Sequence, residues 1–247
     1  MRSVVPGDRG QSNVIGVALL LAITVIGIGG MAAGIGAVID ENADAADATT
    51  VADGFDDSLQ PTSTTGHRTG DVRFTSGQVG VEPRQLRVLN ETGPIETVPV
   101  DALVYESGET RVAYHSDAVV RGSPGNAWFR TEPPITIDQR SEGPVVISAA
   151  QLNASHIGIG GNSNRPVQLE TDVSHERHNL GTDSYRIAVE TSTPGPWKRY
   201  FEEIGATVET TDRKFAGDRE TSVVATIDGE RTAYLVTHDL RLEVSHG

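Results

Sequence analysis

One segment near the N-terminus carries no charged side chain: Val14 to Ile39, VIGVALLLAITVIGIGGMAAGIGAVI. A helix over this segment, rising about 1.5 Å per residue, would be about 39 Å long, and the hydrocarbon core of a bilayer is roughly 30 Å thick. A helix of this length in a soluble domain would show a polar face, but Thr24 is the one polar residue in the run. The segment therefore predicts a membrane-spanning helix.

The charges on either side of this segment predict its orientation. Arg2 and Arg9 precede it, whereas Asp40 and Glu41 follow it directly. Because basic residues are enriched on the cytoplasmic side of membrane helices, we expect a cytoplasmic N-terminus and residues 40–247 outside the cell. The predicted location is the cell membrane, crossed once, with lipid as the first partner.

An ordinary secretory signal peptide is the alternative. Such a signal has an apolar core of roughly 7–15 residues followed by small residues at the cleavage site. The apolar run here is longer, but Gly34, Gly36 and Ala37 near its end would supply the small residues. Whether the segment is removed in this way stays open at the level of sequence.

The residues just before the apolar run form a more specific motif. They are Arg9, Gly10, Gln11 and Ser12, and the run then opens Asn13-Val14-Ile15-Gly16-Val17. This motif resembles the class III signal peptide of archaeal type IV pilins. The resemblance implies that a prepilin peptidase cuts between Gly10 and Gln11, which removes residues 1–10 as a cytoplasmic leader and leaves the apolar segment on the mature protein.

The resemblance covers about residues 8–40 and has one departure. Many archaeal pilins have proline where this chain has Asn13, and this leaves the cleavage dipeptide unaffected. Bacterial type IV pilins carry glutamate at the position of Ile15; archaeal members lack it, so its absence favours an archaeal protein. Two roles remain open for such a membrane-anchored surface protein. It is either a minor subunit of a pilus-like filament, with other pilin-like subunits as partners, or an anchored extracellular binding protein that does not polymerise.

Glycines punctuate the predicted membrane helix. Gly30 and Gly34 lie one turn apart on one helical face. Small residues at this spacing let helices approach closely, so the pair is a candidate packing site between subunits. Glycine is also generally common in membrane helices, and that second interpretation needs no packing role.

After the apolar run, a narrow apolar stripe predicts an amphipathic stalk. Its residues recur at helical spacing: Ala48, Val51, Ala52, Phe55 and Leu59. Aspartates fill the other faces, and a solvated linker is the alternative. The membrane helix and stalk together span residues 11–60. The segment Pro61–Gly70 has no apolar residue and is predicted to be a loop and domain boundary.

Residues 71–247 form the predicted extracellular domain. Short runs of alternating apolar and polar residues separated by turns favour an antiparallel β-sandwich-like domain. Asp228-Gly229 predicts a hairpin turn. The segment Pro194–Gly205 predicts one short helix whose aromatic face packs on the chain's own sheet. The expected fold class is α+β: a long N-terminal hydrophobic helix followed by this mainly antiparallel domain.

Composition narrows the choice of partners and of habitat. The formal net charge is −14, and Lys198 and Lys214 are the only lysines among 20 basic residues. Nucleic acid is therefore not an expected partner, because phosphate binding needs clustered basic residues. An acidic, lysine-poor chain is typical of a proteome adapted to high salt, which suggests a halophilic source; together with the resemblance to archaeal pilins it implies a haloarchaeal one. The chain has no cysteine, which excludes disulfides and thiol chemistry.

No catalytic or metal-binding motif emerges, so we expect neither an enzyme nor a cofactor. His175 and His178 are three residues apart, whereas the zincin motif places its histidines four apart. The glycine-rich stretch Gly158–Asn162 lacks the features of a phosphate loop and predicts a turn. No nucleophile elbow occurs either. A secreted hydrolase on a signal anchor is thus the least supported hypothesis.

Two triplets match the sequon for N-glycosylation. They begin at Asn90 (Asn-Glu-Thr) and Asn153 (Asn-Ala-Ser), and both would lie outside the cell in the predicted topology. Such triplets also arise by chance, so both are candidate modification sites only.

Overall fold

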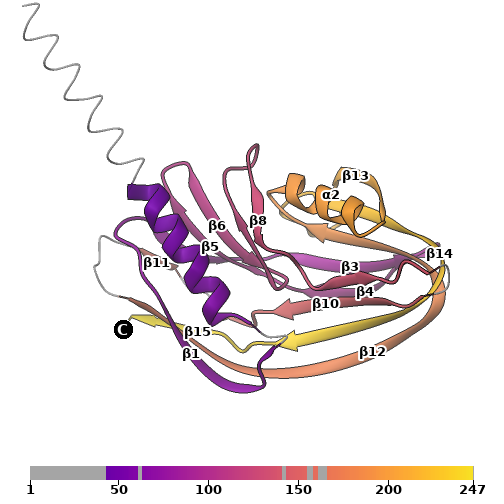
Figure 1. Ribbon diagram of the computed structural model, residues 1–247, viewed down its shortest axis with the longest axis horizontal. Coiled ribbons are helices and arrows are strands. Elements are labelled where there is room, and N and C mark those ends of the chain that lie inside the picture. Colours follow the sequence, from indigo (N-terminus) through magenta and orange to yellow (C-terminus); the bar gives the residue numbers. More distant parts are fainter. Residues whose placement is uncertain (1–42, 61–62, 141–142, 155–157, 161–165, 247) are drawn as a thin grey trace, which may run out of the picture. The chain divides into compact units, whose positions relative to one another are not determined.

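The computed structural model describes residues 43–60, 63–140, 143–154, 158–160 and 166–246 (Figure 1). The predicted cleavage site, the apolar segment and the Gly30/Gly34 pair lie outside these residues. Residues from Asp44 onward form one compact unit.

The predicted fold class is wrong. The described residues are mostly β-strand, arranged in two sheets, and their two helices, over residues 43–58 and Pro194–Glu203, are short. Neither helix of the described residues is long and apolar enough to cross a membrane. The physical reason for the β-rich architecture is that two very long strands collect most of the short ones, so a single sheet holds much of the chain.

The first sheet has nine strands. Its main order is β4-β3-β12-β14-β10-β9, and β1, β13 and β15 pair with the two long central strands. The pairing of β10 with β14 is parallel, and the other described ladders of this sheet are antiparallel. The strands are β1 Gly66–Val72, β3 Gln85–Asn90, β4 Gly93–Pro99, β9 Ile135–Ile137, β10 Val145–Gln151, β12 Val167–Glu190, β13 Thr207–Arg213, β14 Ser222–Asp239 and β15 Glu243–His246.

The second sheet has six strands in the order β11-β2-β5-β6-β7-β8, and each described ladder in it is antiparallel. Strand β8 lies at one edge of this sheet. The strands are β2 Gln78–Glu82, β5 Ala102–Ser107, β6 Thr110–His115, β7 Ala118–Arg121, β8 Trp128–Thr131 and β11 Gly158–Gly160. The stretch predicted as a glycine turn therefore contains the short strand β11.

The predicted hairpin at Asp228-Gly229 is wrong, because β14 runs through this point as one strand. Ser184 of β12 faces Glu230 and Arg186 faces Thr226, so Ile227, Asp228 and Gly229 lie opposite Tyr185 alone. This is a bulge, which Gly229 permits with its φ of +77°. The same glycine that would have served a tight turn instead bends a long strand.

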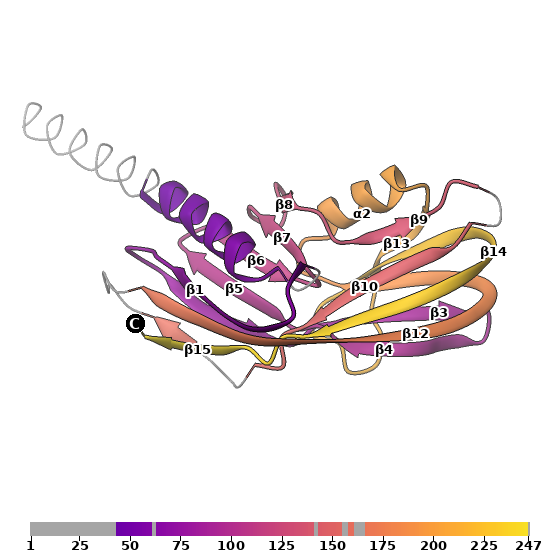
Figure 2. The same cartoon turned by 60° about the horizontal axis from the view of Figure 1, so that its bottom comes forward.

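The two helices occupy two separate hydrophobic cores (Figure 2). The helix over residues 43–58, called the N-terminal helix below, packs with Tyr105, Tyr114 and Leu240 in the first core. Helix α2, Pro194–Glu203, packs on the nine-stranded sheet in the second. Its aromatic side chains Trp197 and Phe201 are fully buried, which confirms that this stripe packs on the chain's own sheet.

The segment predicted to be a loop, Pro61–Gly70, is partly strand, because β1 begins at Gly66. The N-terminal helix packs very closely against this strand. A Cβ atom on Gly70 would lie 2.0 Å from Ser58 Oγ, and one on Gly54 would lie 3.1 Å from Val72 Cγ2. The segment has no apolar residue, which suggested a loop. Its second half is nevertheless a strand, and Gly70 in this strand lets the helix approach closely.

A buried ion pair fastens the connection between β13 and β14 to the far face of the nine-stranded sheet. Arg87 Nη2 donates to Asp218 Oδ1 at 2.5 Å, and the two side chains are 7% and 0% exposed. The second oxygen of Asp218 accepts from the Phe215 backbone N–H and the Ser222 hydroxyl. The Arg87 guanidinium also lies 4.7 Å from the centre of the Phe215 ring.

We expect Asp218→Ala to lower the free energy of unfolding by about 3–5 kcal/mol, because it leaves the Arg87 charge buried without its partner. The double variant Arg87→Met/Asp218→Leu should lose less, since no isolated charge remains. Asp172→Ala is the matched control, because Asp172 pairs with Arg241 and both side chains are more than half exposed. Urea unfolding of the three variants checks this, and equal losses for Asp218→Ala and Asp172→Ala would contradict it.

Candidate functional site: the junction of the N-terminal helix with the β domain

The N-terminal helix is built into the domain through its apolar side. Ala48, Val51, Ala52, Phe55 and Leu59 are between 0% and 2% exposed. They are the residues of the predicted apolar stripe, and their burial confirms it. Burial of a phenylalanine or leucine side chain contributes about 1.5–3 kcal/mol each, so this face alone holds the helix firmly on the sheets.

The first turns of the helix are fixed by a buried carboxylate. Asp47, which is 8% exposed, accepts three hydrogen bonds at Oδ2. The donors are the Thr75 backbone N–H at 2.8 Å, the Thr75 hydroxyl at 2.7 Å and the Ser76 backbone N–H at 3.1 Å. Hydrogen bonds to a charged acceptor are stronger than neutral ones, so this group joins the helix to the segment between β1 and β2.

A second carboxylate reaches the six-stranded sheet from the same end of the helix. Asp44 Oδ1 accepts from the Ser107 hydroxyl at 2.7 Å and from the Ser76 hydroxyl at 3.1 Å. Ser76 and Ser107 also contact each other at 3.0 Å. Asp44 and Asp47 therefore share Ser76 as a partner, and one polar cluster connects the helix to two strand ends.

Two arginines of the sheet edge bind the solvent side of the helix. Arg121 donates to the Ala45 carbonyl at 2.9 Å and to the Thr49 hydroxyl at 2.7 Å. Further along, Arg130 contacts Asp53 at 3.0 Å. The helix thus has apolar, carboxylate and arginine contacts on different sides, which fixes its rotation as well as its position.

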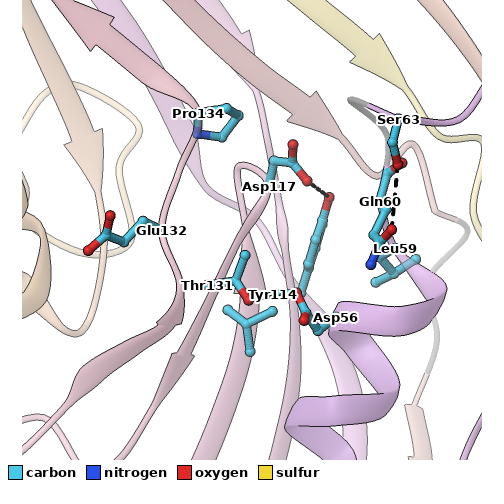
Figure 3. Close-up of a pocket in the computed structure, with 10 residues that line it drawn as sticks. Asp56, Leu59, Gln60, Ser63, Tyr114, Asp117, Thr131, Glu132 and Pro134 are labelled. Carbon is cyan, nitrogen blue, oxygen red and sulfur yellow. Dashed lines mark hydrogen bonds between the residues drawn. The ribbon is translucent and has the colours of Figure 1, made fainter.

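A cavity of about 210 Å³ lies where the helix ends (Figure 3). Leu59, Gln60 and Ser63 form one wall, and Figure 3 shows Tyr114 and Asp117 between them and Pro134. The Tyr114 hydroxyl donates to Asp117 at 3.2 Å. Burial raises the pKa of Tyr114 well above its usual value, and the negative charge of Asp117 adds to this effect.

The walls of this cavity carry carboxylates but do not form a metal site. Asp56, Asp117 and Glu132 contribute to the lining, and Asp56 is engaged by the Thr131 hydroxyl at 2.6 Å. Across the described part of the chain, no three histidine or acidic side chains are grouped closely enough to hold a metal ion. We assign the cavity no ligand.

Sequence reasoning placed Asp44 and Asp47 on the polar, solvent-facing side of the stalk and missed their role. A signal was available: Asp44, Asp47, Ala48 and Val51 follow the helical spacing of the apolar stripe. The acidic pair therefore continues the buried face toward the start of the helix. Its partners in residues 75, 76 and 107 could not be read from spacing, because they depend on tertiary contacts.

The two candidate glycosylation sites have different surroundings. Asn90 ends β3 at the tip of the β3–β4 hairpin, where its side-chain oxygen accepts from the Thr92 N–H and hydroxyl. Its amide nitrogen donates to Asp183 at 3.0 Å. Asn153 follows β10 with a φ of +43°, is exposed, and donates to Asp239 at 2.8 Å. Modification of either residue stays a prediction.

The histidine pair of the sequence is not brought together, but a different pair is. His175 and His178 both lie in β12, where His178 faces Leu235. His175 instead meets His238 of β14, with 2.7 Å between their Nδ1 atoms. His238 Nε2 lies 2.7 Å from the Ser148 hydroxyl, and His175 Nε2 lies 2.9 Å from the Thr65 hydroxyl. The two Nδ1 atoms share a single hydrogen. If His175 donates it, the Nδ1 atom of His238 is unprotonated and accepts, and the reverse holds if His238 donates.

Two buried histidines have lowered pKa values. Burial lowers the pKa of His238 to about 4, with His175 adding to the effect. Burial lowers the pKa of His115 to about 3, and the positive charges of Arg84 and Arg111 contribute. His115 Nε2 has no hydrogen-bond partner, and its ring packs edge-on against Trp197 at 5.5 Å. Both imidazoles are therefore neutral in the folded protein at neutral pH.

We expect Asp47→Ala to lower the free energy of unfolding by about 2–4 kcal/mol, because it leaves two backbone N–H groups and a hydroxyl without their acceptor. Hydrogen exchange should rise along the N-terminal helix in the same variant. Asp53→Ala is the control from the same helix, since its ion pair with Arg130 is about half exposed and contributes about 0–1 kcal/mol. Unchanged exchange in Asp47→Ala would show that the carboxylate does not hold the helix.

Stability should fall as the pH drops from about 6.5 toward 4. Below about pH 6.5 the unfolded chain binds protons at His115 and His238 that the folded chain does not bind, so acid favours unfolding. The stabilisation that comes from keeping these two histidines neutral is fully present above about pH 6.5. Urea unfolding at about pH 7.5 and about pH 4.5 measures it. His238→Gln should reduce the difference between the two values, whereas His178→Gln, which replaces a half-exposed side chain, should leave it unchanged.

Comparison with known proteins gives one match. A family model described as a family of unknown function (DUF7289) covers residues 9–243. Searches of curated proteins and of solved structures return no match. The matched region starts before the apolar segment and ends in the last strand, so the apolar segment, the junction and the β domain all fall within it. The chain therefore belongs to the family of unknown function DUF7289.

Proposed function

We propose that this protein is a type IV pilin-like surface protein. A prepilin peptidase removes the leader between Gly10 and Gln11, the apolar segment of residues 14–39 anchors the chain in the membrane, and the β domain lies outside the cell. In this proposal the protein is a minor subunit of a pilus-like filament. The filament forms when apolar segments leave the lipid and pack together, with the acidic domains on the outside.

The observation that carries the proposal is the construction of the junction. The described part of the N-terminal helix starts at Ala43, four positions after Ile39 in the sequence, and the helix is part of the hydrophobic core of the domain. Asp44 and Asp47 fasten its first turns to residues 75, 76 and 107. A force or a displacement applied to the chain at residue 44 is therefore transmitted directly to the sheets.

This construction favours a subunit over a tethered binding protein. A binding domain on a membrane anchor works best on a flexible, solvated linker, which lets it search for its partner. A filament subunit needs the opposite, because every domain must take the same position relative to its neighbours. No linker rich in Gly, Ser or Pro separates residue 39 from the helix. One family model covers both the apolar segment and the domain, over residues 9–243.

The composition of the surface is compatible with this role. A net charge of −14 keeps domains soluble and hydrated at high salt, where screening over a few ångströms removes most of their mutual repulsion. Neighbouring acidic domains can then come close together on a filament. At low salt the same charges would oppose assembly.

Processing is tested by the mass of the mature protein. Gly10→Val should leave a precursor about ten residues longer, because the peptidase needs a small residue before the cut, and deletion of the peptidase should have the same effect. Gly7→Val changes the leader outside the cleavage dipeptide and serves as the control. A mature N-terminus at Gln11 in the wild type and in Gly7→Val is expected. A mature N-terminus beyond residue 34 would instead identify an ordinary signal peptide and refute the proposal.

Assembly is tested separately by shearing cells that produce the protein. The mature chain should appear in the sheared filament fraction together with other subunits. If correctly processed protein stays entirely with the membranes, the protein is an anchored surface protein that does not polymerise.

A further inference from the structure

An exposed tryptophan lies at the edge of the six-stranded sheet. Trp128, in β8, is 45% exposed, whereas the other tryptophan of the chain, Trp197, is fully buried. Among the described residues, only Ile95 is a comparably exposed large apolar side chain, at 38%. An exposed tryptophan on an acidic, strongly hydrated surface calls for a physical reason, because burying its ring would stabilise the fold.

The position of Trp128 is set by the contacts of β8 with the N-terminal helix. Thr131 contacts Asp56 near the end of the helix, and Arg130 contacts Asp53 before it. Trp128 pairs with Arg121 in the ladder, and Arg121 reaches Ala45 and Thr49. Strand β8 therefore follows the helix, with Trp128 at the level of the first helical turns. Figure 2 shows β7 and β8 next to this helix.

This is the end of the helix that the apolar segment precedes. Ala45 follows Ile39 by six positions in the sequence, and six residue steps of a fully extended chain span about 20 Å. From Ala45 the path to the tryptophan is short. Its carbonyl is 2.9 Å from the Arg121 guanidinium, which lies 5.7 Å from the centre of the Trp128 ring. Trp128 is thus within reach of the bilayer surface for a chain anchored through residues 14–39.

Two arginines accompany Trp128. Arg121 of β7 lies over the Trp128 ring, and Arg130, two residues further along β8, is paired with Asp53. Ser123 ties the loop between β7 and β8 to the Glu109 backbone at 2.6 Å. An exposed tryptophan with an arginine over its ring suits the interface of a bilayer, where the ring lies among headgroups and arginine side chains extend toward phosphates.

We propose that Trp128, with Arg121 beside it, is a membrane-contact site: the ring lies in the headgroup region of the bilayer and sets the orientation of the domain before assembly. This inference rests on the anchoring in the proposed function. Its occupant is a lipid surface, and a second copy of the chain is the competitor that the experiment must distinguish.

The test uses the full chain in phosphatidylcholine vesicles whose acyl chains carry bromine close to the headgroup or deep in the bilayer. The chain has two tryptophans, so the emission of wild type minus that of Trp128→Phe isolates Trp128. This replacement changes an exposed side chain and leaves both cores intact. We expect shallow bromines to remove more of this emission than deep ones, and vesicles to protect it from aqueous iodide. The Trp197 emission that remains in Trp128→Phe should respond to neither quencher.

Two outcomes would overturn the membrane contact. Emission from Trp128 that iodide quenches and bromine does not would place the ring in water. Quenching or a spectral shift that appears only when the protein-to-lipid ratio is raised would identify a second copy as the occupant. Flotation of the vesicles separates this failure from that of the proposed function. A chain that floats with unquenched Trp128 is anchored but lacks the contact, and a chain that does not float refutes both.

Discussion

The pairing of β12 with β14 is the interaction on which the other parts of the domain depend. These strands face each other from Ser174 to Glu190 and from Ser222 to Asp239. One end of β12 also carries β1 and β15, and its other end carries β3. β14 in turn holds β13 and β10. Two bulges in this ladder let the pair bend and serve two hydrophobic cores, one around each helix.

The acidic residues of the chain are used in two ways. Many of the described ones are exposed at the surface, whereas others are buried, and Asp47, Glu190 and Asp218 are among the buried ones that bind specific donors. Glu190 accepts from the backbone N–H groups of Arg219 and Glu220, as Asp47 does from those of Thr75 and Ser76. Each of these three carboxylates joins a connecting segment to a sheet or helix. An aspartate count therefore says little about structure until the burial of each group is known.

Local patterns in the sequence predicted elements better than they predicted their arrangement. The helix at Pro194–Glu203 was predictable because proline, an aromatic stripe and Gly205 all lie within one short segment. The stripe from Ala48 to Leu59 was predictable for the same reason. The bulge at Gly229 was not, since Asp-Gly is equally suited to a turn, and only the partner strand decides between them. The close contact of Gly70 with Ser58 was likewise invisible in sequence, because it joins a helix to a strand through the absence of a side chain.

The candidate site shows the same difference between local patterns, which the sequence reveals, and tertiary contacts, which it does not. The apolar face of the junction could be read from helical periodicity, but the hydroxyls and backbone groups that bind Asp44 and Asp47 come from two other segments of the chain.

The core around the N-terminal helix has a further consequence, because Leu240 and Leu242 complete it. The first helix of the domain and its last strands are thus separated by most of the sequence, which makes this a core of high contact order. During synthesis or export from the N-terminus, residues of β1, β5 and β6 can cover part of the apolar face of the helix early, but the core is complete only after Leu242 has emerged. One side of this core therefore stays open until late in the delivery of the domain.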